Sequence, residues 1–152
     1  MPDVADPLAR LLVERACEQL IYEYARRVDF GEASRIADLF TADGRWDGTE
    51  LALEGQEQIR AWFTKREAIA RRVSRHVFTN VVVEIDSPTT AHARSYMVNF
   101  RHDRQEGDLS LPVPAEAAKY VGECHDRFRL TDDGWRFSHR RVEISFVRAR
   151  RA

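Results

Sequence analysis

Histidine and cysteine are the side chains of this sequence that are best suited to acid–base or metal chemistry, with five histidines and two cysteines. Histidine changes charge near neutral pH, which makes it the natural choice for a general base. His102, Asp103 and His125 would offer metal ligands, but their spacing matches no recognised motif, and we expect no metal site. Cys17 and Cys124 form neither a CxxC pair nor a disulfide framework, and we expect both to be buried, unpaired thiols.

The charge balance gives no reason to expect nucleic acid or an acidic membrane as a partner. Lys+Arg number 24 against Asp+Glu 25, for a formal net charge of −1. No apolar stretch approaches the roughly 20 residues that a membrane helix needs. Residues 1–9 lack the basic and apolar segments of a secretory signal. The length of 152 residues fits one domain over residues 1–152, which we expect to be cytoplasmic.

Helical periodicity dominates the first half of the chain. One long amphipathic helix is indicated by an apolar stripe that ends before Gly31: Val13, Ala16, Cys17, Leu20, Ile21, Tyr24 and Val28. A short helix is expected at 32–40. The pair Asp47-Gly48 predicts a tight hairpin turn. A third helix is expected to begin at Gly55 and to end at the basic pair Arg71-Arg72.

After Ser74 the apolar period changes to that of β-strands. Strands are predicted at 74–86, 91–102, 118–131 and 134–147, with a long loop at 103–114. Helices followed by an antiparallel sheet indicate an α+β fold with the helices on one face of a curved sheet.

The strand at 74–86 carries apolar residues on both faces. Strict alternation puts His76, Phe78, Asn80 and Val82 on one face and Val77, Val81, Val83 and Ile85 on the other. The helices can cover only one of these faces. A second copy of the chain is the simplest cover for the other, so we predict a homo-oligomer, either a homodimer or a homotrimer.

Three stretches of the chain, in order, carry a resemblance to a known family. They are LIYEYARRVD at 20–29 with IADLFTADG at 36–44, RHVFTNVVV at 75–83, and DRF at 126–128 with DGWRFSHRRV at 133–142. Together they resemble the SnoaL-like branch of the NTF2-like superfamily. The resemblance implies an NTF2-like (cystatin-like) cone, in which N-terminal helices pack on a curved, mainly antiparallel sheet around a deep pocket.

The resemblance also implies a set of catalytic residues. In the lyases of this branch an aspartate at the end of the first helix pairs with a histidine on a sheet strand; the matching residues are Asp29 and His76. The related dehydrochlorinase has a pocket arginine five positions after a tryptophan, and counting from Trp135 gives Arg140. A tyrosine or lysine of the first helix faces the same pocket, and Tyr24 is the candidate.

These residues could catalyse a cofactor-independent elimination, with a dehydratase as the first hypothesis. His76 would remove a proton from carbon, Asp29 would orient the imidazole, and Arg140, Tyr24 or Asn99 would stabilise the oxyanion or leaving group. Neither a metal nor an organic cofactor is required. An isomerase or cyclase could use the same pocket. A non-catalytic subunit, similar to the β subunits of ring-hydroxylating dioxygenases, would need no such pair.

The expected ligand is a small hydrophobic, cyclic or polyketide-like molecule. Candidate binding residues are Trp46, Phe63, Phe78, Asn80, Met97, Asn99 and His102. Leu53 and the loop at 103–114 are expected to contribute to the shape of the pocket. His92, His125 and His139 have no motif partner and are expected at the surface or in packing.

Each catalytic candidate also has a structural interpretation, which the sequence leaves open. His76 could be a core histidine bonded to a carbonyl, and Tyr24 a packed tyrosine. Asp29 lies off the apolar stripe of a regular helix, as a solvated residue would. Arg140 could form an ion pair on the outer face of the sheet, since one of the two alternating faces of its strand must be convex. Asn80 could tie a turn or a strand end.

Overall fold

The computed structural model describes residues 6–103 and 110–149, and in these the helices precede most of the sheet. The elements in chain order are α1 (Pro7–Asp29), the 3₁₀ helix η1 (Ala33–Leu39), β1 (Phe40–Asp47), β2 (Ala52–Glu54), α2 (Gly55–Glu67), β3 (Arg72–Ser87), β4 (Thr90–Asp103), β5 (Tyr120–Thr131) and β6 (Gly134–Val147). The strands form one sheet in the order β2-β1-β6-β5-β4-β3. β1 and β6 pair in parallel, and the other neighbours are antiparallel.

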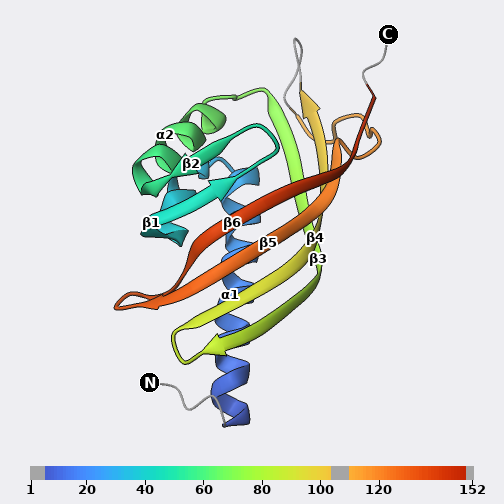
Figure 1. The fold of residues 1–152 in the computed structure, drawn as a ribbon. Helices are drawn as coiled ribbons and strands as arrows, with labels where there is room; N and C mark the ends of the chain where they lie inside the picture. The colour runs from blue at the N-terminus through green and yellow to red at the C-terminus, as the bar shows by residue number, and fades with distance from the viewer. Residues whose placement is uncertain (1–5, 104–109, 150–152) are drawn as a thin grey trace.

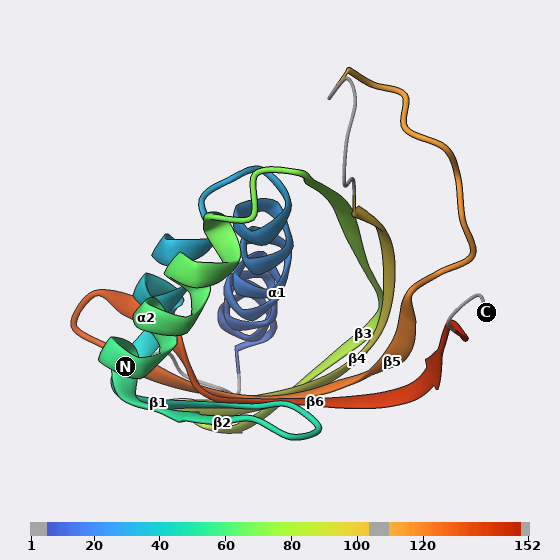
Figure 2. The ribbon, with the colours of Figure 1, turned by 90° about the horizontal axis from the view of Figure 1, so that it is seen from above.

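The sheet bends around the helices, as the sequence predicts for an α+β cone. Figure 1 shows the long strands crossing α1, and Figure 2 shows them curving around the side that carries α1 and α2. Register shifts, typical of β-bulges, interrupt the pairing of the long strands and allow them to bend. One shift lies between Val121 and Gly122, where a β-carbon would stand 2.1 Å from the carbonyl oxygen of Glu143. Only glycine allows the strands to approach so closely there.

The first helix forms as its apolar stripe predicts. Asp6 caps its N-terminus by accepting hydrogen bonds from the backbone of Leu8 and Ala9, and Pro7 occupies the first turn. Gly31, with φ of +80°, takes the left-handed conformation that follows the helix end. The helix is therefore fixed at both ends, and its last residue is Asp29.

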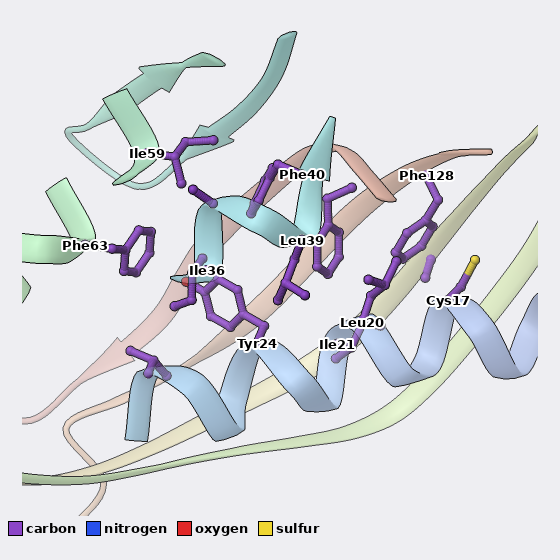
Figure 3. Packing of buried hydrophobic residues seen from close by; sticks show 14 of the residues in the cluster. Cys17, Leu20, Ile21, Tyr24, Ile36, Leu39, Phe40, Ile59, Phe63 and Phe128 are labelled. Carbon is purple, nitrogen blue, oxygen red and sulfur yellow. The ribbon is translucent and has the colours of Figure 1, made fainter. Parts of the chain in front are cut away.

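The core lies between α1, the other helices and the sheet. Figure 3 shows side chains of α1 facing those of η1, β1, α2 and β5; the labelled residues are Cys17, Leu20, Ile21, Tyr24, Ile36, Leu39, Phe40, Ile59, Phe63 and Phe128. Cys17 and Cys124 are free and buried, as predicted. Burial raises the pKa of each thiol to about 12, so both stay protonated at neutral pH.

Several predicted boundaries are wrong, because pairing in the sheet overrides local patterns. The segment 32–40 is a 3₁₀ helix that ends at Leu39, since Phe40 already pairs with β6. The hairpin turn occupies residues 48–51, and Asp47 belongs to β1. The third helix ends at Glu67, and Arg72 pairs with Asp103 as the first residue of β3.

The predicted alternation of β3 fails at Asn80, and this changes which side chains face inward. Asn80 has φ of +52°, and the pairing with β4 shifts between Thr79 and Val82. This irregularity inserts one extra residue into β3, which reverses the alternation. His76 and Phe78 face inward before it, and Val81, Val83 and Ile85 pack inward after it. Val77 and Val82 therefore share the exposed outer face, contrary to the prediction.

Asn80 provides a test of this irregularity. A β-branched residue is strained at positive φ, so Asn80→Val should lower the free energy of unfolding by about 1–2 kcal/mol. Asn80→Gly, the control, relieves the backbone restriction and should stay within about 1 kcal/mol of wild type. Urea denaturation measures both. Equal stabilities of the Val and Gly variants would contradict the left-handed conformation at this residue.

Candidate active site

A pocket of about 820 Å³ opens on the concave side of the sheet. We refer to it as the central pocket. Its walls come from the C-terminal half of α1, from α2, from the turn after β1 and from β3–β6. Most of its lining is apolar and includes Tyr24, Val28, Trp46, Trp62, Phe63, Phe78, Met97, Val142 and Ile144. Such a surface suits a hydrophobic ring.

Asp29 and His76 meet at the wall of this pocket. His76 Nδ1 lies 2.7 Å from Asp29 Oδ1, and the backbone N–H of His76 donates to Asp29 Oδ2 at 2.6 Å. The hydroxyl of Ser74 also donates to Oδ1 at 2.8 Å. The side chain of Asp29 is only 4% exposed, whereas that of His76 is 17% exposed and lines the pocket. Asp29 is therefore not a solvated helix end.

The hydrogen bonds of His76 define its tautomer. Asp29 is an acceptor in its ionised form, so Nδ1 carries the hydrogen and Nε2 carries the lone pair. Asn99, directly opposite on β4, places its amide nitrogen 3.2 Å from Nε2. The amide N–H of Asn99 donates to the lone pair of Nε2. The imidazole is thus held from both sides, with its basic nitrogen on the pocket side of the pair.

Tyr24 lines the pocket with its hydroxyl held in place. The indole N–H of Trp46 donates to the Tyr24 oxygen at 3.1 Å. The phenolic hydrogen has no acceptor among the described residues and is available to a ligand. Burial raises the pKa of the Tyr24 phenol, so it remains a neutral donor. Trp46 in turn stacks on Trp62, with ring centroids 5.7 Å apart.

Arg140 lies in the core beneath the pocket. It is fully buried and forms a two-pronged ion pair with Asp126, at 2.8 and 2.9 Å. Its guanidinium stacks 4.2 Å from the ring centroid of Tyr24 and 5.0 Å from that of Phe78. Arg140 is thus on the concave face, and its ion pair is not on the outer face of the sheet. It also does not line the pocket, so it supports Tyr24 from behind.

The structure separates the other predicted binding residues into two groups. Phe63, Phe78, Met97, Asn99 and Trp46 line the central pocket. The predictions that Asn80, His102 and Leu53 do so are wrong.

Each of the three residues is excluded for a physical reason. The irregularity at Asn80 turns this residue outward, where it is exposed. His102 alternates with Asn99 and Arg101 on β4 and so belongs to the opposite face. Leu53 packs in the core. Of the predicted loop 103–114, residues 104–109 lie outside the described residues, and none of the others lines the pocket.

The remaining histidines lie away from the pocket and contact carboxylates. His92 bonds to Asp86 and His139 to Asp47, each at 2.8 Å. His125 lies near Glu123 and Glu143, and within the described residues these three form the one group that could hold a metal ion. None of the three lines the pocket, and the group differs from the set considered in the sequence.

Sequence analysis missed three arginines of the pocket wall. Arg66 comes from the last turn of α2, Arg72 from the start of β3 and Arg101 from the end of β4. We call them the arginine cluster. Arg66 donates to Ser74 Oγ at 3.0 Å, which extends the network from Asp29. Strand alternation with His76 and Asn99 could have placed Arg72 and Arg101, but no local pattern positions Arg66.

The Arg140–Asp126 pair generates a stability prediction. Asp126→Leu leaves a buried guanidinium without its counter-charge, so we expect a loss of about 3–5 kcal/mol in the free energy of unfolding. The double variant Arg140→Met with Asp126→Leu removes both charges and should recover most of that loss. Thermal and urea unfolding measure both variants. A double variant no more stable than the single one would show that the charges do not act as a pair.

Comparison with known proteins identifies the class of this protein. Residues 9–141 match the SnoaL-like domain family. The chain therefore belongs to the SnoaL-like family, as its sequence resemblance indicated. The curated proteins give no match. No helix among the described residues has the length and apolar character needed to cross a membrane.

Solved structures agree with this assignment at the level of fold. A protein of Novosphingobium aromaticivorans proposed to be a scytalone dehydratase has a TM-score of 0.78 and 18% identity, over 94% of this chain and 91% of that one. An NTF2-like protein with a cystatin-like fold from the same organism has a TM-score of 0.73 and 24% identity, over 95% of this chain and 92% of that one. A Catenulispora acidiphila protein, solved in complex with S-DNPA, has a TM-score of 0.71 and 19% identity, over 88% of this chain and 94% of that one.

Proposed function

We propose that the protein is a cofactor-independent lyase, a dehydratase of a small hydrophobic cyclic or polyketide-like molecule. The observation that carries the proposal is the Asp29–His76 pair, joined at 2.7 Å beside an apolar pocket. A carboxylate bonded to one imidazole nitrogen makes the other nitrogen a well-oriented base. A non-catalytic binding subunit would not need an oriented base on the wall of its pocket.

The geometry suggests a sequence of proton transfers. When the Asn99 amide turns from Nε2 to the oxygen of the ligand, the lone pair of Nε2 is released. Nε2 of His76 then takes a proton from the carbon next to a carbonyl, and the electron pair moves into an enolate. Asp29 stabilises the imidazolium that forms. The hydroxyl of Tyr24 and the amide of Asn99 are the donors that can reach the developing oxyanion. The imidazolium then returns its proton to the hydroxyl on the neighbouring carbon, which leaves as water while the double bond forms.

The same residues would support an isomerase or a cyclase. In an isomerase the proton on His76 returns to carbon and no group leaves. Product mass separates the possibilities, because dehydration lowers the mass of the substrate by one water. Arg140 has no direct part in any of these reactions, since its side chain is fully buried and paired with Asp126.

The dyad can be tested by substituting each of its two members. With a cyclic β-hydroxy ketone that the protein turns over, Asp29→Asn and His76→Ala should each lower kcat by about 10²–10⁴-fold, because the first loses the tautomer and the second loses the base. Mass spectrometry follows the loss of water. His92→Ala is the matched control, since His92 also bonds to a carboxylate but lies outside the pocket. A His76→Ala protein with wild-type turnover would refute the mechanism.

We also propose that the protein is a cytoplasmic homodimer or homotrimer. The outer face of the sheet exposes Val77, Val82, Tyr96 and Phe100, each at least 46% accessible, so apolar surface remains for a second copy. Sedimentation equilibrium should give a mass of two or three chains of 17.6 kDa. Tyr96→Lys, which places a charge on that face, should shift the equilibrium toward monomer. A monomeric wild-type protein would contradict the proposal.

A further inference from the structure

The arginine cluster occupies one end of the central pocket, beyond the Asp29–His76 pair. Arg101 lies directly across from Ser74, and Asn99 directly across from His76. The cluster therefore begins two strand positions from the base, or about 7 Å along the sheet. A ligand whose reacting carbon lies at Nε2 of His76 can therefore place a substituent from another part of the molecule against the cluster.

The charges of the cluster are only partly balanced by the protein. Asp103 pairs with Arg72 at 2.5 Å and with Arg101 at 2.7 Å. Arg66 forms no ion pair among the described residues and donates instead to the neutral hydroxyl of Ser74. Asp29, behind Ser74, is already bonded to His76. Three guanidinium groups thus face two carboxylates, Asp103 and Asp29, and the cluster keeps a net positive charge.

The position of Arg66 is electrostatically unfavourable without a ligand. It is half-buried, and burial, together with the charges of Arg72 and Arg101, lowers the pKa of its guanidinium. Asp29 and Asp103 oppose this shift only in part. Arginine remains charged even so, and a partly compensated charge costs stability. The neighbouring walls of Trp62 and Phe63, from the same helix, are apolar. A pocket with flat aromatic walls and a net positive charge suits a ring that carries an acid group.

We propose that the central pocket binds a ring compound bearing a carboxylate, with the carboxylate held by Arg66 and the ring directed toward His76. Binding of the acid stands on the cluster alone; the claim that this acid is the substrate rests on the proposed lyase function. The planar fork of arginine matches a carboxylate in two hydrogen bonds, which would fix the orientation of the ring. The exposed Glu50 carboxylate, which also lines the pocket, would repel an acid group placed against it.

Benzoate and benzamide, which share a ring and differ in charge, are the probes for this subsite. Titration is followed by the indole N–H resonances of Trp46 and Trp62, which line the pocket. Benzoate should bind wild-type protein about tenfold more tightly than benzamide. Arg66→Gln should weaken benzoate binding about tenfold and leave benzamide binding unchanged. Arg66→Lys keeps the charge but loses the planar fork of arginine. Its affinity for benzoate should lie between those of wild type and Arg66→Gln.

Lys65→Gln is the matched control, because it removes a neighbouring positive charge that is exposed and outside the pocket. It should change both affinities by less than about twofold. Equal affinities of benzoate and benzamide for wild-type protein would overturn the proposal. So would an equal loss of both in Arg66→Gln, or indole resonances unmoved by benzoate at its solubility limit. His76→Ala should retain the preference for benzoate, so a failed lyase mechanism and a failed acid subsite give different results.

Discussion

The buried carboxylate of Asp29 is the constraint on which the site depends. It sits at the C-terminal end of α1, where the helix dipole disfavours a negative charge. Three donors compensate for this: the N–H and imidazole of His76 and the hydroxyl of Ser74. All three come from the start of β3, so the same bonds that neutralise the carboxylate fasten the helix to the edge strand. The same hydrogen bonds therefore orient the catalytic histidine and hold α1 against the sheet.

A buried ion pair supports the floor of the pocket. Arg140 and Asp126 are both fully buried, and the guanidinium lies against the rings of Tyr24, Phe78 and Phe137. An apolar pair of similar volume would satisfy the core at least as well. The charged pair instead fixes the planes of two rings whose other faces form the pocket wall. Its contribution is to the shape and electrostatics of the wall, at a distance from the ligand.

The sequence could predict those features that depend on one element at a time. The apolar stripe of α1 gave the helix and its buried face, and the resemblance gave Asp29 and His76. The predicted alternation of β3 was wrong at Asn80 because the positive φ of this residue depends on the pairing with β4. The sequence around Asn80 fits regular alternation. The place of Arg66 in the pocket wall could not be predicted for a similar reason. An arginine of a helix lines the pocket only when α2 is placed over β3 and β4. The position of Arg140 in the core depends on its ion pair with Asp126, fourteen residues earlier on the neighbouring strand β5.

The irregularity at Asn80 divides β3 into two stretches with opposite alternation. The stretch before it carries Ser74, His76 and Phe78 toward the pocket, and the stretch after it carries Val81, Val83 and Ile85 toward the core. Because the alternation restarts at this point, the inward positions of one stretch do not dictate those of the other. Substitutions at positions 74, 76 and 78 can therefore change the pocket while the apolar side chains of the other stretch stay in the core.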